Sequence, residues 1–233
     1  MTSKEILIFV EGPSDKVFLE VYLYFLEDLP IKNFKVQNIK GKDNLFKRLL
    51  EIEKYDKTLI IFDADIKKES QESDAGFDNK LKHIREKFKE KGTDFPKEQI
   101  FLFPNNQDDG DLETLLLKIA KHDEFLKCFE GYLECIKSKE YYKPIKNIRK
   151  NMLYAYLEVF ELQKFFQYKW DTNNKKNEEN IIIDDKGKIK EEHQEEYEKL
   201  KEVIDFKSKS LIPLKNFLEK STENKQKTKL KIF

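Results

Sequence analysis

The sequence predicts an α/β fold: a Rossmann-like parallel sheet with flanking helices, plus a mainly helical C-terminal extension. From Glu5 to Leu117, short β-branched or aromatic runs alternate with longer amphipathic stretches. This order with short connections is typical of a parallel sheet covered by helices. Past Lys121 the strand signals nearly vanish. We therefore expect an α/β domain over residues 1–120 and a helical extension, packed on it, over residues 121–233.

Four runs have the length and composition of buried strands, and a stretch with helical spacing follows each of them. The expected strands are Ile6–Val10, Phe34–Ile39, Leu59–Phe62 and Ile100–Phe103. The expected helices after them are Ser14–Leu26, Asn44–Ile52, Phe77–Glu90 and Leu112–Lys121. Ser14 follows Pro13 at the position of an N-cap, and Asp15 would complement the helix dipole in the first turn.

The pattern of the second half predicts helices with Phe, Tyr and Leu on one face. They are expected at Glu124–Ser138, Ile145–Lys169 and Glu191–Val203. The polar tract between them, residues 171–196, is expected to form a hairpin tip or a mobile segment. The stretch from Lys220 to Phe233 shows little periodicity, so we expect a frayed tail.

Composition excludes several classes of protein. The chain has 233 residues, of which 39% are hydrophobic and 39% charged, with 7 Gly and 6 Pro. This balance fits a highly charged globular protein and not a collagen or a Pro/Gly-rich disordered chain. Its longest apolar runs fall far short of the roughly 20 residues that span a bilayer. We expect a cytoplasmic protein with no membrane partner, in which Cys128 and Cys135 lie too far apart on one helix for a disulfide.

Acidic residues follow three of the four expected strands. Glu11 and Gly12 end the first strand, with Asp15 close behind, and the third strand runs into Asp63-Ala64-Asp65. After the fourth strand comes Asp108-Asp109-Gly110-Asp111-Leu112-Glu113. The carboxyl ends of parallel strands meet at one edge of the sheet, where ligands of such folds bind. The sequence therefore predicts a cluster of carboxylates at that edge.

Clustered carboxylates repel one another unless a cation compensates their charge. Mg²⁺ is the expected compensator, with Mn²⁺ as a substitute, because both are hard ions that take carboxylate oxygens. Each motif alone also has an ordinary structural explanation as a turn or helix cap. Their joint occurrence in the order of the strands favours a metal site.

A strand running into Glu-Gly-x-x-Asp, followed by a later strand ending in Asp-x-Asp, resembles the Toprim domain. That domain occurs in primases, type IA and type II topoisomerases, OLD-type nucleases and recombination proteins. The resemblance covers residues 5–120. The segments 108–113 and 212–218 also look like those of a Toprim-related group of bacterial proteins of unknown function.

The resemblance implies roles for particular residues. Glu11 is similar to the Toprim glutamate that acts as general acid/base or metal ligand, and Asp15 to the acid that closes the first motif. Asp63 and Asp65 match the pair that binds Mg²⁺. Asp111 and Glu113 are candidates for a second metal position. Lys42 could place a cation beside a phosphate, although an ordinary surface lysine explains it as well.

The sequence also departs from the Toprim pattern. Many Toprim domains have a Gly soon after Asp-x-Asp, whereas Ile66 and Lys67 follow here. Gly41-Lys42 continues with Asp and so forms no Walker A motif, which means that no ATPase domain is expected on this chain. Receiver and haloacid-dehalogenase-type phosphatase folds fit less well, because strand one ends in Glu-Gly.

The sequence is compatible with two functions. The first is metal-dependent phosphodiester cleavage of DNA or RNA, with Lys143, Lys146, Arg149 and Lys150 as candidate phosphate contacts. The second is a non-catalytic Toprim scaffold or interaction module in a larger nucleic-acid-processing or defence complex. A homodimer or a protein partner is compatible with either function.

Overall fold

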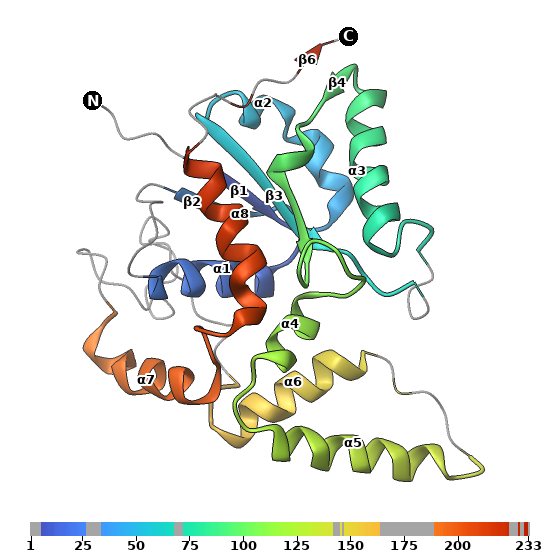
Figure 1. The fold of residues 1–233 in the computed structure, drawn as a ribbon, viewed down its shortest axis with the longest axis vertical. Coiled ribbons are helices and arrows are strands. Elements are labelled where there is room, and N and C mark those ends of the chain that lie inside the picture. The colour runs from blue at the N-terminus through green and yellow to red at the C-terminus, as the bar shows by residue number, and fades with distance from the viewer. Residues whose placement is uncertain are drawn as a thin grey trace. The chain divides into compact units, whose positions relative to one another are not determined.

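Figure 1 shows the fold of the protein as a ribbon, in a computed structural model. The structure describes residues 6–26, 34–67, 72–141, 145, 147–163, 189–223, 228 and 231–232. Contacts divide the chain into two compact units. Unit 1 comprises residues 1–115 and 209–233, and unit 2 comprises residues 116–208. This division differs from the expected one in two ways: the first boundary follows residue 115 and not residue 120, and the last 25 residues belong to unit 1.

Unit 1 is built around four parallel strands in the order β2-β1-β3-β5. They are β1 (Ile6–Val10), β2 (Phe34–Asn38), β3 (Lys57–Asp63) and β5 (Ile100–Phe103). In register, Ile8 pairs with Val36 on one side and with Leu59 on the other. The expected α/β class and four-stranded parallel sheet are thus confirmed, in a Rossmann-like layout.

Helices cover both faces of this sheet (Figure 1). On one face lie α1 (Pro13–Phe25) and α8 (Ile212–Glu223), where Phe18 packs edge-on against Phe103 and Phe217 packs against Phe101. On the other face, α2 (Leu49–Ile52) and α3 (Phe77–Glu90) contribute to a buried cluster with β1, β3 and β5. Burial on both faces explains why every residue of β1 is apolar.

Three helical segments that begin in unit 1 differ in detail from the prediction. Residues expected as one helix over 44–52 form a 3-10 helix η1 (Lys42–Lys47) followed by the short α2. In α1, Gly12 is the N-cap in place of the expected Ser14, and Pro13 takes the first helical position, where its missing N–H costs nothing. The helix expected over 112–121 is α4 (Leu112–Lys118).

The remaining elements of unit 1 are short. They are β4 (Thr93–Asp94), η2 (Lys97–Gln99), η6 (Lys209–Leu211) and β6 (Lys231–Ile232). The expectation of a frayed tail is wrong for the described residues of this stretch. Strand β6 pairs antiparallel with β4, and Lys57 Nζ donates to the Ser221 carbonyl oxygen at 2.6 Å. This stretch shows little periodicity because a buried hydroxyl and a two-residue strand, and not a long helix or strand, hold its last described residues.

Thr228 is the buried anchor of this C-terminal segment. Its hydroxyl accepts a hydrogen bond from the Thr58 N–H and donates one to Gln99 Oε1, both at 2.9 Å. Thr228→Val keeps the shape but leaves two buried polar groups without a partner. We expect it to lower the free energy of unfolding by about 1–3 kcal/mol, measured by urea denaturation. Thr228→Ser keeps the hydroxyl and should lose less; equal stability of the Val variant and the parent would contradict this role.

Unit 2 is helical. It holds α5 (Asp123–Lys137), α6 (Ile148–Val159), η5 (Glu191–His193) and α7 (Gln194–Val203). The Tyr156 hydroxyl donates to the Val203 carbonyl oxygen at 2.8 Å and so ties α6 to the end of α7. His122 stacks on Phe160 with ring centroids 4.9 Å apart. Of the tract expected to be mobile, residues 171–188 lie outside the described residues.

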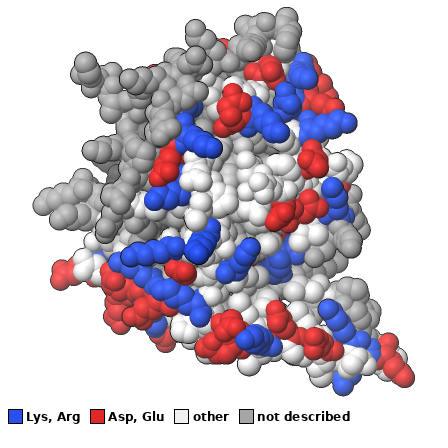
Figure 2. Space-filling view, in the orientation of Figure 1, with Lys and Arg blue, Asp and Glu red and all other residues white. Residues whose placement is uncertain are grey.

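None of the helices in the described residues combines the length and hydrophobicity that a membrane span requires. Cys128 and Cys135 are both exposed and free, as predicted. Figure 2 shows basic and acidic side chains interspersed over the face drawn, without a large patch of one sign.

Candidate functional site

The topology of the sheet fixes where a site is expected. The chain passes from β1 outward to β2 and then back across β1 to β3, so the direction of the strand order reverses between β1 and β3. At such a switch point the loops leave in opposite directions and open a crevice at the carboxyl ends of the two strands. Glu11 directly follows β1 and Asp63 ends β3, so both predicted site residues lie at this point.

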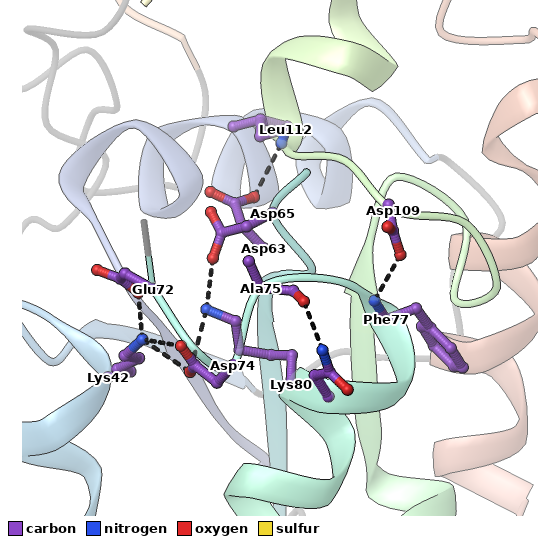
Figure 3. A network of polar contacts seen from close by, with 11 residues as sticks. Lys42, Asp63, Asp65, Glu72, Asp74, Ala75, Phe77, Lys80, Asp109 and Leu112 are labelled. Carbon is purple, nitrogen blue, oxygen red and sulfur yellow. Dashed lines mark hydrogen bonds and ion pairs between the residues drawn. The ribbon is translucent and has the colours of Figure 1, made fainter. Parts of the chain in front are cut away.

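Asp63 is the centre of the carboxylate cluster. Its Oδ1 accepts a hydrogen bond of 2.9 Å from the N–H of Leu112, at the start of α4 (Figure 3). Burial raises the pKa of Asp63 well above its usual range, and the negative charges of Asp15, Glu113, Glu11 and Asp111 raise it further. The structure therefore brings together five of the predicted acidic residues.

Asp65 is held beside Asp63 by an unusual backbone. Its φ of 62° lies in the left-handed region, and it forms an isolated antiparallel bridge with Gly110. Gly110 has a φ of 152°, and a side chain there would come within 2.9 Å of Pro104. A glycine at 110 therefore lets the acidic loop after β5 approach the Asp-x-Asp turn closely.

Figure 3 shows the Asp63 and Asp65 carboxylates next to each other, each engaged through one oxygen. Leu112 donates to Oδ1 of Asp63, and Lys80 Nζ lies 2.5 Å from Oδ2 of Asp65. Among the described residues, the structure gives no donor to the other oxygen of either carboxylate. Two adjacent oxygens of this kind fit the preference of Mg²⁺ for one or two carboxylates plus waters.

Glu11 is the predicted acid/base residue. Burial raises the pKa of Glu11 to about 7; Lys80 and Lys42 lower it, while Asp65 and Asp15 raise it. Its backbone carbonyl oxygen accepts a hydrogen bond of 3.0 Å from the Gly41 N–H, which fixes the end of β1 against the loop after β2. A carboxyl group with a pKa near neutrality can both take up and release a proton at physiological pH.

Three predicted acidic residues also have structural roles at helix starts. Asp15 is buried and its Oδ2 accepts from the Gly12 N–H at 2.8 Å, which stabilises the first turn of α1. Asp111 Oδ1 accepts from the N–H and the hydroxyl of Thr114 at 2.8 and 2.6 Å, so it caps α4. Glu113 lies in the first turn of that helix. Among the described residues, no group of three or more His, Cys, Asp or Glu side chains is arranged as a ready-made metal site.

Lys42, for which both a role beside a phosphate and an ordinary surface position were considered, is held by two acidic side chains. Its ammonium group lies 2.7 Å from both carboxylate oxygens of Asp74 and also pairs with Glu72. Burial alone would lower the pKa of Lys42, but the hydrogen bonds to Asp74 and Glu72 outweigh it and raise the pKa. In this structure Lys42 therefore stabilises the loop that carries Asp74.

Of the four candidate phosphate contacts in the helical half, two lie in unit 2 and two lie outside the described residues. Lys143 and Lys146 lie outside the described residues. Arg149 and Lys150 are in the first turn of α6, and Lys150 Nζ is 5.9 Å from the ring centroid of Tyr154. Lys150 is exposed, as either a phosphate contact or a solvated lysine would be.

Sequence reasoning missed three residues of this network: Glu72, Asp74 and Lys80. Lys80 left a detectable signal, because it lies on the apolar face of α3, three residues after Phe77 and four before Ile84. A lysine at an apolar position of an amphipathic helix indicates a buried partner. Glu72 and Asp74 had no such signal, since they lie in a polar loop.

Comparisons with known proteins place the chain in a family. Residues 5–223 match the family described as "Protein of unknown function (DUF3226)". Comparison with curated proteins and with solved structures found no match. The match spans both units. It includes α8 and the sheet edge that carries Glu11, Asp63 and Asp65, called the carboxylate edge below. The chain therefore belongs to the DUF3226 family.

Proposed function

We propose that this protein is a Toprim-like enzyme that hydrolyses phosphodiester bonds in nucleic acid with the help of a divalent metal ion. The observation that carries the proposal is the meeting of Asp63, Asp65 and Glu11 at the switch point of a parallel sheet. The order of these residues along the chain also matches the Toprim pattern. Together, position and order support a metal site better than either does alone.

The residues at the edge would have different roles in this reaction. Asp63 and Asp65 would hold Mg²⁺ or Mn²⁺ through their neighbouring oxygens, with Asp111 and Glu113 close enough to act on the charge at Asp63. When bound, the ion would neutralise the phosphate and lower the pKa of a water molecule. Asp15 and Leu112 keep the surrounding helix starts in place through their hydrogen bonds.

Glu11 is the residue suited to the proton step. Its pKa of about 7 allows it to accept a proton from the attacking water at neutral pH. The water oxygen forms a bond to phosphorus as the bond to the leaving sugar oxygen breaks. Glu11 then gives the proton to the leaving oxygen, so that one water yields an alcohol and a phosphate monoester.

The test is incubation of the purified protein with plasmid, single-stranded DNA and RNA in Mg²⁺, Mn²⁺ or EDTA. We expect cleavage only with metal, and a fall of about 100-fold or more in the Asp63→Asn variant, because loss of even an outer-shell contact of a metal site costs about 10–100-fold. The variant, purified identically, controls for contaminating nucleases. Absence of cleavage across the panel would contradict the enzymatic proposal and favour a non-catalytic scaffold.

A further inference from the structure

Lys80 is a lysine buried within the carboxylate edge. Its side chain is 1% exposed, and its ammonium group lies 2.5 Å from Asp65 Oδ2 and 3.6 Å from Asp74 Oδ2. Removing an ammonium group from water costs several kcal/mol unless close negative charges compensate it. The position of Lys80 is therefore explained by the two carboxylates that it joins.

The pairing continues in a chain of alternating charges (Figure 3). Asp74 forms ion pairs with both Lys80 and Lys42, and Lys42 also pairs with Glu72. The charge of Lys80 also acts on Glu11, whose pKa it lowers. A fixed positive charge thus touches Asp65 and influences the residue proposed for the proton step.

We infer that Lys80 takes the place of a second metal ion, so that the edge binds one divalent cation and not two. The inference rests on the metal site of the proposed function. The ammonium group occupies the side of Asp65 that faces Asp74, and a divalent ion there would meet its repulsion. The ion would use the neighbouring oxygens of Asp63 and Asp65 that the Leu112 N–H and Lys80 leave available.

This assignment changes the expectation for Asp111 and Glu113. The sequence suggested them as ligands of a second metal, but Asp111 Oδ1 caps α4 through Thr114. With Lys80 as the second cation, these two carboxylates are not needed for another ion. Lys80 is then a positioning residue, which fixes Asp65 and supplies charge without leaving the protein.

The test counts bound Mn²⁺ ions per chain by equilibrium dialysis with metal analysis, without nucleic acid. We expect one ion in the parent and two in Lys80→Met, where Asp65 and Asp74 would gain a cation in place of the ammonium group. Lys80→Arg keeps the charge and should bind one. The matched control is Lys82→Met on the same helix, whose side chain is 74% exposed and which should also bind one.

Each result decides the question. Two ions in the parent, or one in both the parent and Lys80→Met, would overturn the inference. No ion in the parent would overturn the inference together with the proposed metal site. If the parent cleaves nucleic acid but binds the same number of ions as Lys80→Met, the inference fails and the proposed function stands. If Lys80→Met unfolds in EDTA, Mn²⁺ should restore its folding and saturate at two ions per chain; failure to do so would overturn the inference.

Discussion

Asp63→Asn is expected to stabilise the metal-free protein and to abolish its stabilisation by Mg²⁺. The Asp63 carboxylate is disfavoured by burial and by the charges of Asp15, Glu113, Glu11 and Asp111. Asparagine removes this repulsion, yet its side-chain oxygen can still accept the hydrogen bond from Leu112. At pH 8 in EDTA the unfolding midpoint should rise by a few degrees, since a chain of this size gains about 2–4 °C for each kcal/mol.

The addition of Mg²⁺ separates this variant from the parent. A ligand at 100 times its Kd stabilises a protein by about 2.7 kcal/mol, so the parent should gain several degrees and Asp63→Asn nothing. Asp43→Asn, at an exposed position in η1, is the matched control and should behave as the parent. A lower midpoint for Asp63→Asn in EDTA would show that the Asp63 carboxylate has a structural role. An undiminished Mg²⁺ shift would show that Asp63 does not hold the ion.

Asp65→Asn tests metal binding at the same edge less directly, because it also changes an ion pair. It would remove the closest carboxylate partner of the buried Lys80 ammonium group. Breaking a buried ion pair on one side destabilises proteins by about 3–5 kcal/mol. We therefore expect the double variant Asp63→Asn/Asp65→Asn to lose folding stability as well as any metal binding, so that a loss of activity would be harder to interpret.

The second large effect is a dependence of stability on pH that Glu11 introduces. Its pKa is about 7 in the folded protein against 4.5 ordinarily, because burial raises it; Lys80 and Lys42 lower it and Asp65 and Asp15 raise it. A raised carboxyl pKa means that the folded state binds the proton more tightly than the unfolded state. The resulting stabilisation is fully present below about pH 4.5 and is lost as the pH rises through about 7.

This loss corresponds to roughly 3 kcal/mol at 1.36 kcal/mol for each pKa unit. Urea unfolding in EDTA between pH 5 and 8 should therefore show a fall in stability for the parent and a smaller fall for Glu11→Gln. Mg²⁺ should stabilise the parent more at pH 8 than at pH 5, because it binds the ionised carboxylates. The same fall with pH in Glu11→Gln as in the parent would assign the effect to other groups.

Much of the sheet was predictable from local sequence. Strands β1 and β5 are apolar and fully buried and β3 is nearly so, whereas the edge strand β2 carries polar residues and is only partly buried. The clear apolar period of α3 placed this helix at its observed bounds. The short η1 and α2 were harder, since nine residues with helical spacing do not distinguish a 3-10 turn from an α-helix. Assignment of α8 to the sheet depended on long-range contacts such as Phe217 with Phe101, which no local pattern reveals.

The carboxylate edge was predictable because topology alone brings strand ends together. Its electrostatic balance was not, since the compensating lysine comes from a separate element, near the start of α3. The Lys80 signal, a charge on an apolar helix face, indicates burial without indicating a partner. The partners Asp65 and Asp74 are 15 and 6 residues away in sequence and meet Lys80 only in the folded chain.

The most direct test of the central claim is a crystal structure of the protein with Mn²⁺, in which anomalous scattering locates the ion. We expect one anomalous peak at coordination distance from Asp63 and Asp65, with the Lys80 ammonium group still beside Asp65. Manganese absent from this edge at saturating concentration, in a crystal where these residues are ordered and free of lattice contacts, would contradict the account.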